Sequence, residues 1–146
     1  MSLGRKRCPY ILFTVAAFII TLSVAQAQTI IIAAANSMES SKAKADIVCT
    51  GEGDQAIINR AIASLPEVGG AVMLLEGNYD IRREEGKLGG ILIERSNVTL
   101  MGVGAATKLI QAPNQNTNVI RIIGEGVSHV TIRDLCVDAN RDANPD

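Results

Sequence analysis

Hydrophobic and polar residues divide the chain into an apolar opening segment and a longer patterned region. Basic residues at positions 5–7 precede an uncharged apolar run over 11–24, and Ala25-Gln26-Ala27 has the small-x-small pattern that a signal peptidase accepts. This run is shorter than the roughly 20 residues that span a bilayer. The pattern predicts a signal peptide over residues 1–27 that is cleaved at its end. The alternative is an uncleaved anchor, because residues 29–35 are apolar again.

The clearest helix is predicted from Asp54 to Leu65. Apolar residues recur there at the spacing of one helical stripe, and they are Ile57, Ile58, Ala61, Ile62 and Leu65. Asp54 is predicted to be the N-cap, with its side chain accepting hydrogen bonds from the free N–H groups of the first turn. Pro66 ends the helix, and Gly69-Gly70 turns the chain.

The rest of the patterned region has the period of short β-strands. Residues 29–35 and 46–49 are predicted strands, separated by a loop or short helical turn over 36–44, and Gly77-Asn78 is a predicted turn. No second helix is expected after residue 65. Further strands are predicted at residues 71–75, 79–82, 91–93, 98–101, 108–110, 119–123, 130–132 and 135–137.

An internal repeat links two of these strands. The sequence SNVTL of residues 96–100 recurs as SHVTI in residues 128–132. Short strands that repeat at a period of a few tens of residues indicate a solenoid, although a β-sandwich also contains many short strands. The single early helix favours the solenoid, because a helix at that place can cover the open end of the core.

Several segments resemble the N-terminal part of pectin-lyase-like right-handed parallel β-helix proteins. They are residues 53–62, residues 69–79 (GGAVMLLEGNY) and residues 96–104 (SNVTLMGVG). Residues 131–142 (TIRDLCVDANRD) are similar to a rung of the alginate C5-epimerase branch, and residues 29–55 resemble secreted archaeal cell-surface β-helix proteins. The resemblance implies a mostly β fold, the start of a right-handed parallel β-helix (solenoid) with an N-terminal capping α-helix.

This fold implies three regions. They are the signal peptide (1–27), an N-terminal strand with the capping helix (28–70), and the first coils of a truncated β-helix (71–146). Aliphatic residues are expected to point inward and form ladders, and they are Ile91, Ile93, Val98, Leu100, Ile120, Ile122, Val130, Ile132, Leu135 and Val137. In the resembling lyases, epimerases and hydrolases the catalytic groups lie on later coils, so the resemblance assigns no catalytic residue here.

Composition limits the classes of partner that the chain is expected to bind. The 146 residues carry 14 Lys and Arg against 15 Asp and Glu, so no basic face is expected to bind nucleic acid. Removal of residues 1–27 takes away three bases and no acid, which makes the remaining chain more acidic. Aromatic residues make up 3% of the chain, and stacking platforms for bases or sugars are therefore scarce.

The C-terminal segment suggests one metal site. Asp138, Asn140 and Asp142 place oxygen donors at alternate positions, and such donors are typical calcium ligands. They are the candidate metal ligands, and no other cofactor is predicted. The alternative is a polar turn, because an extended strand spreads such side chains too far to close on one ion.

Other candidate groups for chemistry are incomplete. His129 is the one histidine, with Asp134 as its nearest downstream acid, and a turn residue is the alternative role. Asp134 and Asp138 are too far apart in an extended strand for a glycosidase pair unless the chain turns between them. Cys49 and Cys136 are expected to stay unpaired, and a single disulfide in an oxidising compartment is the alternative. Residues 97–99 (NVT) form a glycosylation sequon, usable where the host glycosylates secreted proteins.

The sequence therefore predicts a secreted or cell-surface β-helix module with a structural or carbohydrate-contacting role. An acidic polysaccharide or cell-surface glycan is the expected partner, membrane contact is limited to the signal, and the open C-terminal coil is expected to self-associate. The alternative is the N-terminal fragment of a polysaccharide-active enzyme, a uronan lyase, C5-epimerase or hydrolase whose catalytic coils are missing. Whether the chain is an enzyme stays open, since it holds no complete catalytic constellation.

Overall fold

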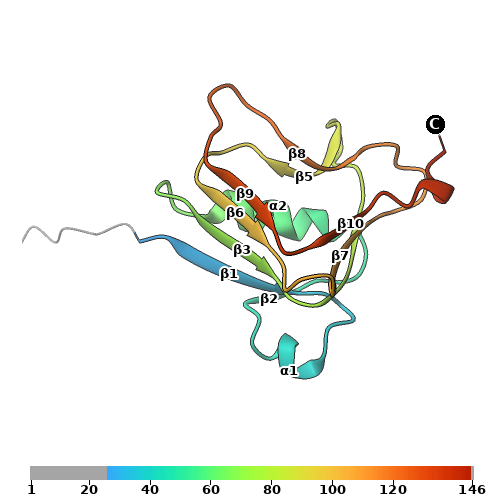
Figure 1. Cartoon of the computed structure of the whole chain (residues 1–146), viewed down its shortest axis with the longest axis horizontal. Helices are drawn as coiled ribbons and strands as arrows, with labels where there is room; N and C mark the ends of the chain where they lie inside the picture. Colours follow the sequence, from blue (N-terminus) through green and yellow to red (C-terminus); the bar gives the residue numbers. More distant parts are fainter. Residues whose placement is uncertain (1–25, 146) are drawn as a thin grey trace, which may run out of the picture.

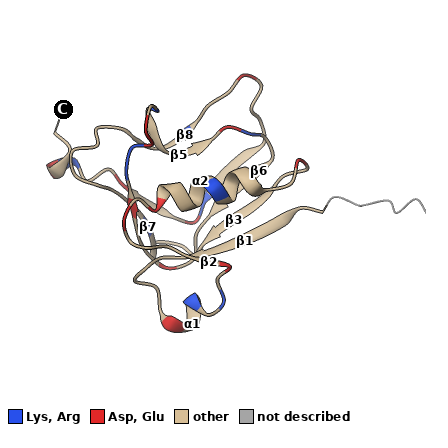
Figure 2. Cartoon of the chain, turned by 180° about the vertical axis from the view of Figure 1, so that it is seen from behind, with Lys and Arg blue, Asp and Glu red and all other residues tan. Residues whose placement is uncertain are grey.

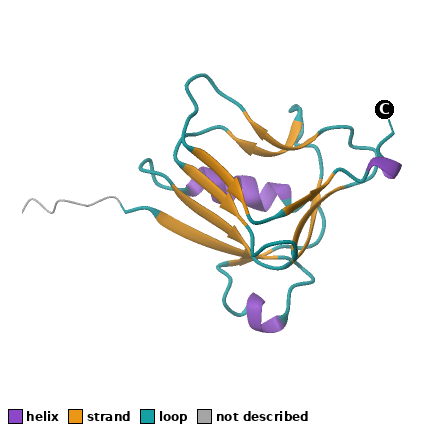
Figure 3. Cartoon of the chain, in the orientation of Figure 1, coloured by secondary structure: helices purple, strands orange, loops and turns teal. Residues whose placement is uncertain are grey.

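The computed structural model describes residues 26–145, so residues 1–25 of the predicted signal peptide lie outside the described residues. The described part is mostly β, with few helices (Figure 1, Figure 3). Most predicted strands are confirmed to within one or two residues. The elements are β1 (Gln28–Ala33), α1 (Glu39–Lys42), β2 (Ile47–Val48), α2 (Gln55–Ser64), β3 (Gly70–Leu74), β4 (Gly77–Ile81), β5 (Gly89–Ile93), β6 (Val98–Met101), β7 (Thr107–Gln111), β8 (Asn118–Ile122), β9 (Val130–Arg133), β10 (Cys136–Asp138) and the 3-10 helix η1 (Arg141–Ala143).

Two local predictions are wrong. Gly77 and Asn78 belong to β4 rather than to a turn, because they pair in register with Thr107 and Lys108 of β7. A second helical element does follow residue 65, the single turn of η1, which begins after Asn140 in a left-handed conformation. Neither change alters the order of the strands.

The strands form three sheets in which all described pairs are parallel. The first sheet has the order β2-β1-β3-β6-β9, the second β10-β7-β4 and the third β5-β8. The chain visits the three sheets in the same order each time, through β3, β4 and β5, then β6, β7 and β8, then β9 and β10 (Figure 1). This arrangement is compatible with a β-helix.

The internal repeat is stacked residue on residue. Val98 pairs with Val130 and Leu100 with Ile132 across β6 and β9, so SNVTL lies in register on SHVTI. The residues before β3, β6 and β9 are Gly69, Asn97 and His129, with φ angles of 97°, 61° and 55°. A left-handed residue thus introduces each of these strands.

The core lies between the three sheets. Leu74, Leu100 and Leu109 are fully buried, as is Tyr79, whose hydroxyl lies 3.0 Å from the carbonyl oxygens of Ile32 and Leu75. The expected inward ladders are buried in β5 and β6, whereas their last members Ile122, Ile132 and Val137 are 50%, 37% and 48% exposed. These three residues lie on the last described strand of each sheet, where no further strand covers them.

Helix α2 covers the opposite end, where it contacts β3, β4 and β5 (Figure 1). Its predicted apolar stripe is largely confirmed, since Ile58, Ala61 and Ile62 are buried on it. Asp54 is the N-cap residue of α2 by position, as predicted, but the predicted hydrogen bonds from the first turn to its side chain are wrong. Asp54 already has helical angles, and its buried carboxylate instead accepts from the N–H of Gly51, three residues before it, and from the distant N–H of Asp80 on β4. The carboxylate bonds to the edge of β4 rather than to the first turn of α2.

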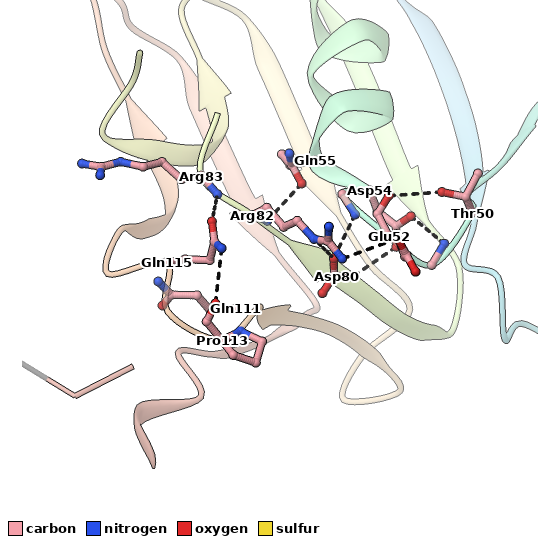
Figure 4. A network of polar contacts seen from close by, with 12 residues as sticks. Thr50, Glu52, Asp54, Gln55, Asp80, Arg82, Arg83, Gln111, Pro113 and Gln115 are labelled. Atoms are coloured by element: carbon pink, nitrogen blue, oxygen red, sulfur yellow. Dashed lines mark hydrogen bonds and ion pairs between the residues drawn. The ribbon is translucent and has the colours of Figure 1, made fainter. Parts of the chain in front are cut away.

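Side chains satisfy the free edge of β4. The N–H groups of residues 78 and 80 in β4, and of residue 82 just after it, donate to Asn36 Oδ1, Asp54 Oδ2 and Gln55 Oε1 at 2.9, 3.0 and 3.0 Å. Figure 4 shows Asp54 and Gln55 reaching from the start of α2 toward this strand. Because an unpaired edge is a template for another strand, these oxygens close this end of the sheet.

Asn59 of α2 satisfies backbone groups at the edge of β5 in the same way. Its Oδ1 accepts from the N–H of Leu92 at 2.8 Å, and its Nδ2 donates to the carbonyl of Gly90 at 2.9 Å. One carboxamide therefore supplies both the acceptor and the donor that a neighbouring strand would present. No helix within residues 26–145 has the length and apolarity needed to cross a membrane.

Candidate functional site

The predicted calcium ligands lie where the chain leaves β10. Asp138 ends the strand, Asn140 has a φ of 45° and Asp142 lies in η1. The Asp138 Oδ1 accepts from the Asn140 backbone N–H at 2.8 Å, and the Asn140 Nδ2 donates to the Gln111 carbonyl at 3.0 Å. Among the described residues no cluster of three His, Cys, Asp or Glu side chains is placed to hold a metal ion. Calcium binding by this mixed Asp and Asn set stays a prediction.

The same end of the molecule carries an open hollow of about 550 Å³. It lies between the end of β7, the loop that leads to β8, and the segment after β10. We call it the amide hollow, and its lining residues are Gln111, Asn116, Thr117, Asn118, Ala139, Arg141 and Asn144. Four of these residues carry carboxamides, and none carries a carboxylate.

Asn144 holds the two walls of the amide hollow together. Its Oδ1 accepts from the backbone N–H groups of Gln115 and Asn116 at 2.7 and 3.3 Å, while its Nδ2 donates to the carbonyls of Ala139 and Asn140 at 3.3 and 3.1 Å. With 8% exposure, this side chain is buried by the contacts it makes. The loop before β8 and the segment after β10 are therefore fixed relative to each other.

Two further carboxamides fix the loop before β8. Gln111 Nε2 donates to the Thr117 carbonyl at 3.1 Å, and Asn118 Nδ2 donates to the Leu88 carbonyl at 3.3 Å. Gln115 extends the network toward β4, since its Oε1 accepts from the Arg83 N–H at 2.8 Å (Figure 4). The loop that borders the hollow is thus tied to the segment that directly follows β4.

Two polar groups of the amide hollow have no partner in the described part of the chain. The Thr117 hydroxyl is shielded from solvent and makes no hydrogen bond there. The Arg141 guanidinium makes no hydrogen bond or ion pair with residues 26–145. Thr117 also borders a second hollow of about 370 Å³ that Arg121 and Leu88 help to line. Residues 116–118 line both hollows. Each hollow contains one arginine, Arg141 in the amide hollow and Arg121 in the second.

The chemistry of the amide hollow suits binding. Carboxamides both donate and accept hydrogen bonds, and a guanidinium donates them, without a change of protonation near neutral pH. The lining contains no His, Cys, Asp, Glu or Lys, so it offers no side-chain general base. The sequence analysis missed this site, although the carboxamide-rich run Asn114-Gln115-Asn116-Thr117-Asn118 was a signal that could have found it.

The predicted catalytic candidates are not brought together. His129 precedes β9 and Asp134 follows it, and Asp134 instead pairs with its neighbour Arg133. The His129 Nδ1 lies 3.1 Å from the Ser128 hydroxyl oxygen. The chain does turn at Asp134, which has a φ of 56°, yet Asp134 and Asp138 then lie at opposite ends of β10.

A groove of about 670 Å³ follows the exposed side of α2. It contains an ion pair between Lys87 Nζ and Glu94 Oε1 at 3.1 Å. Arg95 lies on its border and donates to the carbonyls of Leu65 and Pro66, both at 2.6 Å. Because these carbonyls follow α2 directly, Arg95 serves to anchor the helix end. Acidic and basic residues are interspersed over the ribbon, as Figure 2 shows.

The buried titratable groups belong to the core. Burial, with a smaller effect from Asp54, raises the pKa of the Cys49 thiol to about 12. Burial likewise raises the pKa of Tyr79. Glu76 shifts in the other direction, because hydrogen bonds from the Ser41 side chain and the Met38 N–H lower its pKa. Cys49 and Cys136 are both free thiols.

No protein-family model, curated protein or solved structure matches the chain. The likeness to pectin-lyase-like proteins therefore rests on the sequence segments given above and on the parallel sheets.

Proposed function

We propose that the chain forms the first coils of a right-handed parallel β-helix of the pectin-lyase-like type. Three parallel sheets visited in a fixed order, with SNVTL stacked on SHVTI, support this proposal. The right-handed sense follows from the strong preference of parallel crossover connections for that hand. A helix over one end and an uncovered core at the other end fit the cap and the growing end of a solenoid.

The function that the geometry supports best is non-catalytic contact between a secreted or cell-surface module and an acidic glycan. The amide hollow carries this proposal, since four carboxamides and Arg141 surround a space with no acidic side chain. A sugar presents hydroxyl groups that can donate to the exposed carboxamide oxygens of Asn116 and Asn118, which accept no hydrogen bond from another described residue. A uronate adds a carboxylate, whose two oxygens match the donor fork of an arginine.

The scarcity of aromatic residues also favours an acidic ligand. Neutral sugars are commonly held against an aromatic face, and no Phe or Tyr lines the amide hollow. Charge attraction between Arg141 and a ligand carboxylate has to supply the affinity that an aromatic face would otherwise provide. A calcium ion held by Asp138, Asn140 and Asp142 would lie on the segment that carries Arg141, where it would add positive charge for the same carboxylate.

The experiment is a calorimetric titration of the folded chain with uronate oligosaccharides, carried out with and without calcium. We expect binding that Arg141→Gln weakens at least fivefold, because a neutral carboxamide keeps hydrogen bonding but loses the charge. Arg60→Gln is the matched control, since Arg60 is exposed on α2 and lies outside the amide hollow. Equal affinity of R141Q and the unchanged chain, or no uronate binding at all, would refute the proposal.

The same titration tests the alternative of a polysaccharide-active enzyme. Lyase, epimerase or hydrolase activity would alter the oligosaccharide, which mass spectrometry and NMR detect directly. We expect recovery of the ligand unchanged, because the amide hollow has no group to remove or donate a proton.

A further inference from the structure

Asn97 is an exposed asparagine whose backbone is fixed and whose side chain is free. Its N–H donates to the Ser128 carbonyl at 3.1 Å, and its carbonyl accepts from the Gly70 N–H at 3.0 Å. Within residues 26–145 its carboxamide makes no hydrogen bond. The φ of 61° places Asn97 in the turn before β6, at a corner between two sheets.

The neighbouring turns leave room at this corner. The stacked residue on one side is Gly69, which has no side chain, and a Cβ added there would lie 2.4 Å from the Asn97 Cβ. The stacked residue on the other side, His129, is itself exposed. A large group on the Asn97 carboxamide therefore meets no side chain from the preceding turn and extends into solvent.

Asn97 also begins the one N-x-Ser/Thr triplet of the chain. Thr99 supplies the required hydroxyl. The residue is half-buried on β6, and its hydroxyl makes no hydrogen bond with another described residue. Other exposed asparagines lack this context. Asn78 is exposed but is followed by Tyr and Asp, and the Asn116 carboxamide donates to the Pro145 carbonyl at 3.0 Å.

We propose that Asn97 carries an N-linked glycan in the exported protein. This inference rests on the proposed export and is independent of the amide hollow. The donor is an oligosaccharide joined to a lipid through phosphate. The Asn97 Nδ2 forms a bond to the anomeric carbon and the bond from that carbon to the phosphate oxygen breaks. The lipid phosphate leaves with the bonding electrons, and one Nδ2 proton passes to a base.

The order of events follows from burial. Val98, between Asn97 and Thr99, is fully buried in the folded chain. A transferase that reads the three residues as an extended segment therefore acts before β6 packs into the core. The folded structure then has to accommodate the product, and the exposed corner at Asn97 does so.

The test uses the protein as its native host makes it. Trypsin cleaves after Arg95 and Lys108, which places the sequon in one peptide, residues 96–108. Mass spectrometry of that peptide is expected to show a series of added sugar masses. The same digest reports the N-terminal peptide, so removal of residues 1–27 is read separately from modification of Asn97.

Variants distinguish the requirement for the sequon from any effect of the turn that contains Asn97. Thr99→Ala is expected to abolish the added mass while leaving Asn97 in place, and Thr99→Ser is expected to keep it. Asn97→Gln is expected to abolish it, whereas Asn78→Gln, which changes an exposed asparagine outside the sequon, is expected to have no effect. An unmodified 96–108 peptide in the wild-type protein overturns the proposal, whether or not residues 1–27 have been removed. Added mass that persists in T99A overturns it as well.

Discussion

The Asp54 carboxylate accepts a 3.0 Å hydrogen bond from the backbone N–H of Asp80, at the free edge of β4. The Asp54 N–H in turn donates to the Asp80 carbonyl at 2.9 Å. One residue at the start of α2 thus presents an acceptor and a donor to Asp80, as a neighbouring strand would. The β4 edge of the second sheet is therefore closed by side chains.

Removing the Asp54 carboxylate should be costly. Asp54→Ala leaves the N–H groups of Gly51 and Asp80 without their partner in a site that is fully buried, so we expect a loss of about 3 kcal/mol in unfolding free energy. Asp46→Ala is the control, because Asp46 also accepts a backbone N–H, from Ile31 at 2.7 Å, but is exposed. Water replaces that acceptor, and about 0.5 kcal/mol is expected. Urea denaturation measures both, and equal losses would contradict this account.

Asp54 also shows where a local pattern is insufficient. An aspartate before an apolar stripe has the pattern of an N-cap, and the stripe itself predicted α2 within a residue at each end. One partner of the carboxylate, the Gly51 N–H, is local, but the other lies on β4, and nothing in the residues around Asp54 identifies that second partner. Strand positions followed from local periodicity, whereas the use of α2 side chains as edge partners depends on the assembled sheets.

Gly69 should be more sensitive to substitution than another left-handed glycine. In Gly69→Ala the new Cβ would lie 2.2 Å from the Asn97 carbonyl oxygen, in a residue whose φ is 97°. Gly104 has a similar φ of 96° with no atom within 4 Å of an added Cβ. Gly104→Ala therefore reports the backbone strain alone, about 1–2 kcal/mol.

We expect Gly69→Ala to exceed the loss in Gly104→Ala by at least about 2 kcal/mol, because the clash is with backbone that cannot move aside. Thermal or urea unfolding of the two variants measures the difference. A difference near zero would show that the turns before β3 and β6 are not stacked as described.

Cys49 should make the fold sensitive to alkali. Its pKa rises from an ordinary 9.0 to about 12 on folding, so the unfolded chain ionises first as the pH increases. The contribution of the buried, neutral Cys49 thiol to the free energy of unfolding is complete below pH 9 and is lost as the pH approaches 12. Cys49→Ala should reduce this alkaline loss, whereas Cys136→Ala, at a half-buried thiol, should leave it unchanged.

The same burial predicts the reactivity of the two thiols. Iodoacetamide at pH 8 is expected to modify Cys136 well before Cys49, because the thiolate is the reactive form and Cys49 is also shielded. Peptide mass spectrometry over time distinguishes the two sites. Rapid modification of Cys49 in the folded chain would contradict its placement in the core.

The candidate site was less accessible to sequence reasoning than the fold. The amide hollow combines the loop before β8 with Arg141 and Asn144, which follow β10. Their proximity depends on β7 and β10 being neighbours in one sheet, a relation that the SNVTL repeat reports only for β6 and β9. Carboxamides in a loop also look like ordinary turn residues until their hydrogen bonds are known.

The uncovered end of the core should drive self-association. Ile122, Ile132 and Val137 come from three different sheets and are each more than a third exposed, beside strand edges that no described strand covers. The other end shows how such edges are protected, by α2 and by the side chains that bind β4 and β5. No comparable group of side-chain oxygens meets β9 within the described chain.

We therefore expect residues 28–146 to show a concentration-dependent mass in sedimentation experiments. Ile132→Lys should shift this equilibrium toward monomer, because a charge on β9, the edge strand of the first sheet, opposes both apolar contact and edge pairing. Val103→Lys is the control, since Val103 is 43% exposed but lies in the turn between β6 and β7, away from the uncovered ladder. A monomer at every concentration, or equal effects of the two lysines, would show that the exposed ladder does not drive association.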